Sequence, residues 1–180
     1  MENIKDLVII GSGPAGLSAA VYASRAMIDQ LVIEKEMFSG GQIVTTDRID
    51  NYLGLYGENG YDLSIKFRQH ADELKVPFVE GQVTSIEDKG EIKEITLVNG
   101  DVINTKAIII ATGAKHKVLG VKGEKELTGA GVSYCATCDG AFFRNKTVAV
   151  VGGGNVALED ALYLANICEK VYLIHRRNEL

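Results

Sequence analysis

Two glycine-rich turns with similar neighbours constrain the fold of this sequence most strongly. They read GSGPAG at residues 11–16 and GGGNVA at residues 152–157. Each follows a short β-rich run and precedes a helical stretch that leads into another apolar run. In such a unit the first glycine permits a tight turn, the second lets the backbone approach a pyrophosphate, and the third position allows close helix–strand packing. The sequence therefore predicts two α/β dinucleotide-binding units; the alternative is a glycine turn in an ordinary α/β domain.

The rest of the chain reads as further strands, one helix and connecting segments. The expected elements are a strand at 4–10, a helix at about 14–27, a strand at 30–35, a loop at 39–60, a helix at 62–74, short strands within 77–87 and 91–101, a buried strand in the apolar run 106–114, a polar linker at 114–131, and strand, helix and strand within 147–177.

The two units differ in charge where the second strand of each one ends. Glu34 lies 23 residues after Gly11, and His175 lies the same 23 residues after Gly152, with Arg176 and Arg177 following. A carboxylate suits a free ribose 2′-hydroxyl, whereas an arginine pair suits a 2′-phosphate. We therefore expect the first unit to take FAD or NAD and the second NADP. The alternative for the arginines is a solvated basic turn.

Composition and charge exclude several classes of function. The net charge is −5 without a basic tract, so we expect neither nucleic acid nor an anionic membrane as partner. No run approaches the ~20 apolar residues of a membrane span. The start, MENIKDLVII, lacks the form of a signal peptide, and three cysteines are too few for a disulfide-built secreted scaffold. We expect a cytoplasmic protein.

The motif CATCDG contains the residues that point to chemistry. Cys135 and Cys138 are spaced for a structural disulfide, half of a zinc site or a working dithiol. The three histidines lack ligand spacing, so we expect no metal. Asp139 is the nearest ionisable group and could move a proton as a dithiol cycles; the alternative is a cap or turn residue. Cys168 reads as a small core residue within an apolar helix.

Together these motifs resemble the low-molecular-weight bacterial type of thioredoxin reductase. The resemblance covers essentially the whole chain and runs in the family's order, through GSGPAG, GGQ, ATGA, CATCDG, VVGGGNVALEDALYLAN and HRR. It implies an α/β fold, in which a second Rossmann-like NADPH-binding domain is inserted into a Rossmann-like FAD-binding domain. The expected boundaries are 1–113 for the FAD-binding part and 114–180 for the linker and the NADPH-binding domain with the dithiol.

The resemblance also implies roles for individual residues. Cys138 matches the cysteine that lies against the flavin, Cys135 the one that attacks thioredoxin, and Asp139 the acid–base aspartate. The implied FAD-binding residues are Gly11, Ser12, Gly13, Pro14, Ala15, Gly16, Glu34, Lys35, Gly40, Gly41, Gln42, Asn51, Ala111, Thr112 and Gly113. The implied NADPH-binding residues are Gly152, Gly153, Gly154, Asn155, Val156, Ala157, His175, Arg176 and Arg177.

The implied activity is transfer of electrons from NADPH through FAD and the dithiol to the disulfide of thioredoxin, in a homodimer. Family chains continue well past position 180, so we expect a C-terminally truncated second domain with exposed sheet edges and too little core. The alternatives are a related flavoprotein disulfide reductase that serves another protein acceptor, or an inactive nucleotide-binding fragment.

Overall fold

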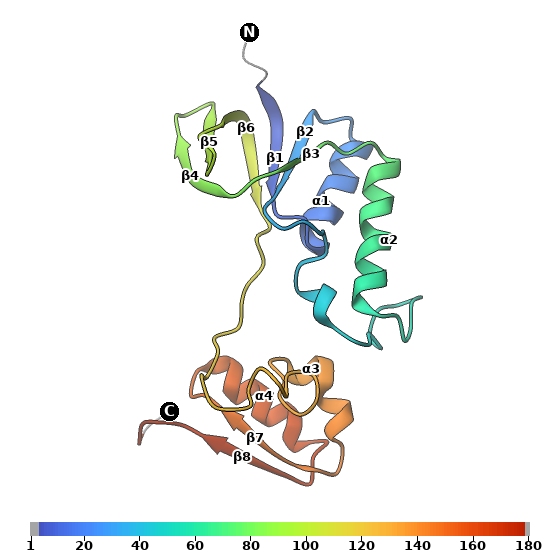
Figure 1. Ribbon diagram of the computed structural model, residues 1–180, viewed down its shortest axis with the longest axis vertical. Helices are drawn as coiled ribbons and strands as arrows, with labels where there is room; N and C mark the ends of the chain where they lie inside the picture. Colours follow the sequence, from blue (N-terminus) through green and yellow to red (C-terminus); the bar gives the residue numbers. More distant parts are fainter. Residues whose placement is uncertain (1–3, 179–180) are drawn as a thin grey trace. The chain divides into compact units, whose positions relative to one another are not determined.

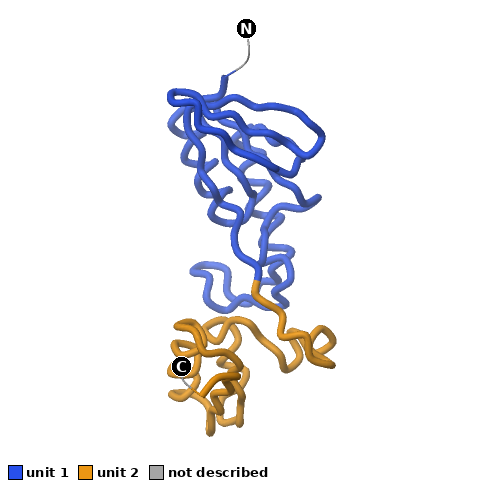
Figure 2. The backbone as a smooth tube through the Cα atoms, turned by 90° about the vertical axis from the view of Figure 1, so that its left-hand side faces the viewer, with its two compact units in different colours: residues 1–115 blue, residues 116–180 orange. Residues whose placement is uncertain are grey.

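The computed structural model describes residues 4–178, which divide into two compact units with the boundary between Lys115 and His116 (Figure 2). In chain order the elements are β1 (Lys5–Ile10), α1 (Pro14–Arg25), β2 (Gln30–Glu34), the 3₁₀ helix η1 (Gly41–Thr45), α2 (Gly60–Glu73), β3 (Phe78–Glu80), β4 (Val83–Asp88), β5 (Lys93–Leu97), β6 (Val102–Ile110), α3 (Ala136–Asp139), the 3₁₀ helix η2 (Gly140–Phe143), β7 (Thr147–Val151), α4 (Asn155–Ala165) and β8 (Lys170–Ile174) (Figure 1).

The first unit is built on a six-stranded sheet in the order β3-β2-β1-β6-β5-β4. The strands β3, β2, β1 and β6 are parallel, and β5 and β4 continue the sheet antiparallel. The carboxyl ends of β1, β2 and β6 meet at one edge, because Ile10 at the end of β1 pairs with Ile33 of β2 and with Ile110 at the end of β6. This is the edge at which α/β sheets bind their ligands.

Apolar side chains cover both faces of this sheet. The helices α1 and α2 pack on one face, and their contact with the strands buries Leu7, Ile9, Leu17, Ala20, Ala23, Val32, Ala71 and Val76. On the other face, alternate residues of β1 and β2 pack against Ile95 and Leu97 of β5. The small residues of α1 allow its close approach to the sheet, as the sequence predicts.

Two local signals set the ends of the helices in the first unit. The helix α1 stops at Arg25, earlier than the expected residue 27, because Met27 adopts a left-handed φ of 57°. The helix α2 starts at Gly60, where the Asn59 side chain accepts a hydrogen bond from the N–H of Tyr61. The segment expected as loop between them contains the short η1.

One prediction is wrong: the apolar run after residue 106 is not buried. Its residues form the end of β6, which begins earlier at Val102, but the side chains of Ile109 and Ile110 are 39% and 68% exposed. A continuous apolar run predicts a strand covered on both faces. Of the three isoleucines in this run, Ile108 packs against the core, whereas the side chains of Ile109 and Ile110 that follow it remain in contact with solvent.

The second unit has little core of its own. Its two parallel strands, β7 and β8, are joined by α4, and its buried apolar residues are Ala136 and Leu164. Many of its large apolar side chains are exposed: Val151, Val156, Leu162, Tyr172, Leu173 and Ile174. The expected shortage of core is confirmed. No helix formed within residues 4–178 combines the length and apolar character that crossing a membrane requires.

Candidate functional site

The turn at residues 11–16 joins the end of β1 to the start of α1. Gly11 has a φ of 103°, and a Cβ atom there would overlap the carbonyl oxygen of Ala111. A Cβ atom at Gly16 would overlap the carbonyl oxygen of Gly11. Gly13 caps α1 without a side-chain hydrogen bond, so the first N–H groups of the helix remain available to phosphate oxygens. The turn therefore fits a pyrophosphate.

Glu34, at the end of β2, holds its carboxylate against this turn. Its Oε2 accepts hydrogen bonds from the N–H of Ser12 at 2.6 Å and from the Ser12 hydroxyl at 2.7 Å. Its Oε1 accepts from the N–H groups of Lys35 and Glu36, at 2.8 Å and 3.0 Å. Burial raises the pKa of Glu34, but these four bonds together outweigh it and hold the pKa below its ordinary value. A fixed negative charge therefore marks this edge of the sheet.

The Ser12 hydroxyl has a second acceptor. It lies 2.8 Å from the Oγ of Ser39, a buried serine that the sequence did not single out. The hydroxyl can therefore turn from Glu34 to Ser39 when a ligand hydroxyl takes its place on the carboxylate. Nothing in the pattern around residue 39 predicts its burial, which comes from tertiary packing.

Two further segments expected at the flavin reach the same edge. The N–H of Gly40 donates to the carbonyl of Ser12 at 2.9 Å, and a Cβ atom at Gly41 would lie 3.5 Å from the Cα of Gly13. The Gln42 amide donates to the carbonyl of Ala114, directly after the turn formed by residues 111–113.

Lys35 and Asn51 are less closely tied to this group. The side chain of Lys35 is exposed and pairs with Glu36 at 3.5 Å. Asn51 is exposed in the turn before α2. In the described part of the chain no hydrogen bond links Asn51 to the glycine turn.

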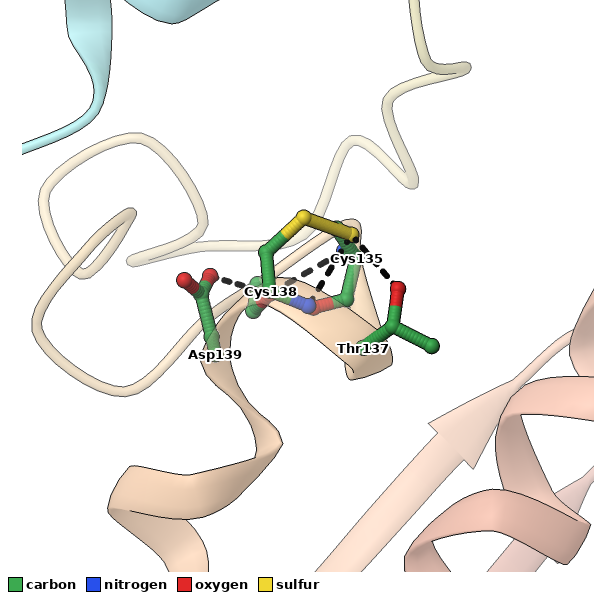
Figure 3. Close-up of a disulfide and its surroundings, with 5 residues drawn as sticks. Cys135, Thr137, Cys138 and Asp139 are labelled. Atoms are coloured by element: carbon green, nitrogen blue, oxygen red, sulfur yellow. Dashed lines mark hydrogen bonds between the residues drawn. A yellow bond between two sulfur atoms is a disulfide. The ribbon is translucent and has the colours of Figure 1, made fainter. Parts of the chain in front are cut away.

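The second unit carries the cysteine pair as a disulfide at the start of α3 (Figure 3). Cys135 is the N-cap residue of this short helix, and its Cα lies 5.3 Å from that of Cys138. The helical turn between them brings the two sulfurs together. In residues 4–178 no group of three or more potential ligand side chains gathers at a metal site.

The two sulfurs differ in their surroundings. The Sγ of Cys135 accepts a hydrogen bond from the N–H of Cys138 at 3.2 Å and lies 3.4 Å from the Oγ1 of Thr137 (Figure 3). The Cys135 sulfur therefore has two hydrogen-bonding neighbours on its own helical turn, whereas Cys138 is the more exposed of the pair.

Asp139 lies half-buried at the end of α3. Its Oδ2 accepts a hydrogen bond from the hydroxyl of Ser133 at 2.6 Å, and its N–H donates to the carbonyl of Cys135 at 3.1 Å. The carboxylate is thus anchored on the same short segment as the disulfide. Sequence reasoning missed Ser133, although a serine two residues before Cys135 is a signal for a local side chain–backbone turn.

The turn at residues 152–157 repeats the form of the first. Gly152 has a φ of 153°, and a Cβ atom there would lie 2.8 Å from the Cβ of Ala157. Gly154 caps α4 without a side-chain hydrogen bond, so the helix begins at Asn155 with free N–H groups. This turn also fits a pyrophosphate.

The basic residues follow β8 beside this turn. The His175 imidazole packs directly on the backbone of Gly153, where a Cβ atom would overlap it. Arg176 and Arg177 are exposed, and neither forms an ion pair in the described part of the chain. The guanidinium groups are therefore accessible to an anion.

Cys168 does not lie within a helix, contrary to the prediction. It follows the end of α4 at Ala165, in the turn that leads to β8, and is half-buried. Its Sγ lies 3.3 Å from the carbonyl of Phe143. It takes no part in the disulfide.

Comparison with known proteins matches this chain to a family of disulphide oxidoreductases. The family model for pyridine nucleotide-disulphide oxidoreductases matches residues 5–180. Two similar relatives are the thioredoxin reductases of Listeria monocytogenes serovar 1/2a and Bacillus subtilis strain 168, at 46% and 45% identity. Each alignment covers 99% of this chain and 56% of the relative, so the chain spans little more than half the length of these curated relatives.

A solved structure shows the same fold over a similar span. The crystal structure of thioredoxin reductase from Streptococcus pyogenes MGAS5005 superposes with a TM-score of 0.90 at 43% identity. The match covers 100% of this chain and 58% of the solved one. The elements of both units therefore recur in that structure, which continues beyond them.

Proposed function

The chain belongs to the pyridine nucleotide-disulphide oxidoreductase family, and from that premise we propose that it carries the redox centre of a thioredoxin reductase. Electrons pass from NADPH through FAD to the Cys135–Cys138 pair and then to the disulfide of thioredoxin. One observation carries the proposal: a paired disulfide lies in the same compact unit as one glycine turn with arginines, in a chain whose other glycine turn faces a carboxylate. The printed names of the relatives support it.

The first turn is proposed to hold FAD. Residues 11–16 present the N–H groups of α1 to the pyrophosphate, and Glu34 accepts hydrogen bonds from ribose hydroxyls. The Ser12 hydroxyl releases the Glu34 carboxylate by turning its hydrogen bond to Ser39. The further proposed contacts are Lys35, Gly40, Gly41, Gln42, Asn51, Ala111, Thr112 and Gly113. When bound, FAD accepts the hydride of NADPH and passes the electron pair on.

The second turn is proposed to hold NADPH. Residues 152–157 approach the pyrophosphate, and His175 shapes the turn by packing on Gly153. Arg176 and Arg177 then bind the 2′-phosphate with charge-assisted hydrogen bonds. When bound, NADPH supplies the hydride.

The cysteine pair completes the transfer. In the reduced state the Cys135 thiolate attacks the disulfide of thioredoxin, and one thioredoxin sulfur leaves as thiolate. The Cys138 thiolate then attacks the Cys135 sulfur of the mixed disulfide, which restores the Cys135–Cys138 bond and releases the second thioredoxin sulfur. Asp139 gives and takes the protons that accompany these steps. We further propose that the protein acts in the cytoplasm as a homodimer.

A second candidate is a nucleotide-binding chain without turnover. It is favoured by the exposed apolar side chains of β7 and β8, since a sheet of two strands leaves its faces largely uncovered. A related disulfide reductase with a different protein acceptor shares all the geometry described above and differs only in its substrate.

Thioredoxin reduction separates these candidates. The purified chain, reconstituted with FAD, is mixed with NADPH and oxidised thioredoxin, and the new thioredoxin thiols are counted. We expect turnover that is abolished in Cys135→Ser and retained in Cys168→Ser, because Cys168 lies outside the pair. Absence of turnover in the parent chain would contradict the proposal, and turnover with glutaredoxin-like acceptors alone would reassign the substrate.

A further inference from the structure

The hydroxyl of Ser133 lies between the backbone of Cys135 and the carboxylate of Asp139. It is 2.6 Å from the Oδ2 of Asp139 and 3.2 Å from the carbonyl oxygen of Cys135. The N–H of Cys135 donates to the same Oγ at 3.1 Å. A single exposed serine thus contacts both the first cysteine of the pair and the aspartate behind the second.

The donors and acceptors of this contact define two arrangements. A serine hydroxyl has one hydrogen and two lone pairs, and the N–H of Cys135 occupies one lone pair. When Asp139 is ionised, the hydrogen points to its Oδ2, which is the nearer and charged acceptor. When Asp139 is protonated, its O–H donates to the second lone pair of Ser133, and the serine hydrogen turns to the carbonyl of Cys135.

We propose that Ser133 is the positioning residue of Asp139, which it keeps hydrogen-bonded beside the cysteine pair in both protonation states. Ser133 neither gains nor loses a proton; its own hydrogen rotates between the Asp139 carboxylate and the Cys135 carbonyl. The catalytic use of this positioning rests on the proposed function, because only disulfide reduction requires Asp139 to change its protonation state. The contact itself rests on the geometry alone.

The neighbouring titratable side chains form no bond with the Asp139 carboxylate in the described residues. The helix α4, which packs on α3, carries Glu159, Asp160 and Tyr163. None of them forms an ion pair or hydrogen bond with Asp139 within residues 4–178. On the preceding segment the Tyr134 hydroxyl donates to Glu124 instead, at 2.7 Å. Ser133 is therefore the side chain in the described part of the chain that hydrogen-bonds the Asp139 carboxylate.

The two arrangements predict a shift in the pKa of Asp139. The bond to the ionised carboxylate is charge-assisted and stronger than the bond to the protonated acid, so Ser133 favours ionisation. Removal of the hydroxyl in Ser133→Ala should raise the pKa of Asp139 relative to the parent chain, because the carboxylate loses this donor. Ser133→Thr keeps the hydroxyl and should restore the parent value.

The pKa can be measured on the oxidised 180-residue chain by carbon-13 NMR of labelled aspartate carboxyls, with Asp139→Asn to assign the signal. Thr137→Val is the matched control, because it removes a neighbouring hydroxyl that contacts the Cys135 sulfur and not Asp139. We expect a raised pKa in Ser133→Ala, and parent values in Ser133→Thr and Thr137→Val. An unchanged pKa in Ser133→Ala, or an equal rise in all three variants, would overturn the proposal.

This measurement needs neither FAD nor thioredoxin, so it stands apart from the proposed function. In a chain that turns over, Ser133→Ala should also move the ionisation of Asp139 in the pH–rate profile upward, by the shift that NMR reports. A shifted pKa in a chain that fails to reduce thioredoxin would refute the proposed function and support the role of Ser133.

Discussion

At the scale of single residues, Glu34 shows how a carboxylate can be prepared for a ligand before the ligand arrives. Four donors hold it at the end of β2, and the Ser12 hydroxyl can leave for Ser39. The charge is therefore fixed in position while one acceptor site can be vacated. A 2′-phosphate next to this carboxylate would be repelled, which supports FAD as the proposed ligand.

The Glu34→Gln variant tests this arrangement through pH. Because the pKa of Glu34 is lower in the folded than in the unfolded state, its carboxylate contributes stability above the unfolded-state pKa of about 4.3. That contribution is lost as the pH falls through the lowered folded-state pKa. We expect Glu34→Gln to cost roughly 1 kcal/mol at neutral pH, after allowing for solvent screening, and less below about pH 4.

Chemical unfolding at several pH values measures this difference. Glu36→Gln is the matched control, because the Glu36 carboxylate is 64% exposed and pairs only with Lys35 at 3.5 Å in the described residues. The same loss of stability at pH 3 as at pH 7 in Glu34→Gln would contradict the assignment.

The sequence predicts the acid at position 34 but not the contacts that tune it. Counting residues from each glycine turn located Glu34 at the last residue of β2 and His175 directly after the end of β8. The roles of Ser39 and Ser133 depend on contacts between segments that only the folded chain brings together. Polar residues in loops carry no periodicity, so their partners cannot be read from spacing.

At the scale of elements, the start of α1 depends on two glycines with different demands. A Cβ atom at Gly16 would overlap the backbone at Gly11, whereas a Cβ atom at Gly13 would meet nothing nearer than the Cα of Gly41 at 4.0 Å. Gly16 therefore serves the packing of helix against strand, and Gly13 leaves space on the ligand side.

These demands predict different results for two alanine variants. Gly16→Ala should lower the free energy of unfolding by roughly 1–3 kcal/mol, because the helix must shift from the sheet. Gly13→Ala should lower the free energy of unfolding less than Gly16→Ala, because only the N-cap preference for glycine is lost, and it should weaken FAD binding. Thermal unfolding without FAD and a fluorescence titration with FAD measure the two effects, and equal destabilisation of both variants would contradict this division.

The end of β8 makes a second prediction at this scale. Replacing Arg176 and Arg177 by alanine should weaken NADPH binding by roughly tenfold or more and leave NADH binding unchanged, because only NADPH carries the 2′-phosphate. Lys170→Ala is the matched control, since Lys170 is an exposed cation at the other end of the same strand. Calorimetry with both nucleotides measures the ratio. An equal loss of affinity for NADH would assign the arginines to a general electrostatic role.

The burial of one strand and the end of one helix differ from the sequence predictions. The apolar run ending at Ile110 correctly predicts a strand, but its burial depends on what lies over it, and β6 is uncovered there. In the same way, the apolar stretch around Cys168 extends past the end of α4, because helix ends depend on capping as well as on apolar character. An apolar composition indicates that a segment can be buried, but it does not show which other segment would cover it.

At the scale of the whole molecule, the chain combines two glycine turns, one beside a carboxylate and one beside two arginines, with a disulfide in two compact units. Its first unit has a full sheet with core on both faces, whereas its second has two strands and two buried apolar side chains. The stability of the second unit is therefore expected to be the lower of the two.

The most direct test of the proposed electron relay is an anaerobic NADPH titration of the purified 180-residue chain, followed through its visible spectrum. We expect a flavin band that NADPH bleaches, with additional reductant consumed by the Cys135–Cys138 disulfide and not by a Cys135→Ser, Cys138→Ser variant. A colourless chain, or a flavin band that NADPH leaves unchanged, would contradict transfer of electrons from NADPH through FAD to the disulfide in this chain.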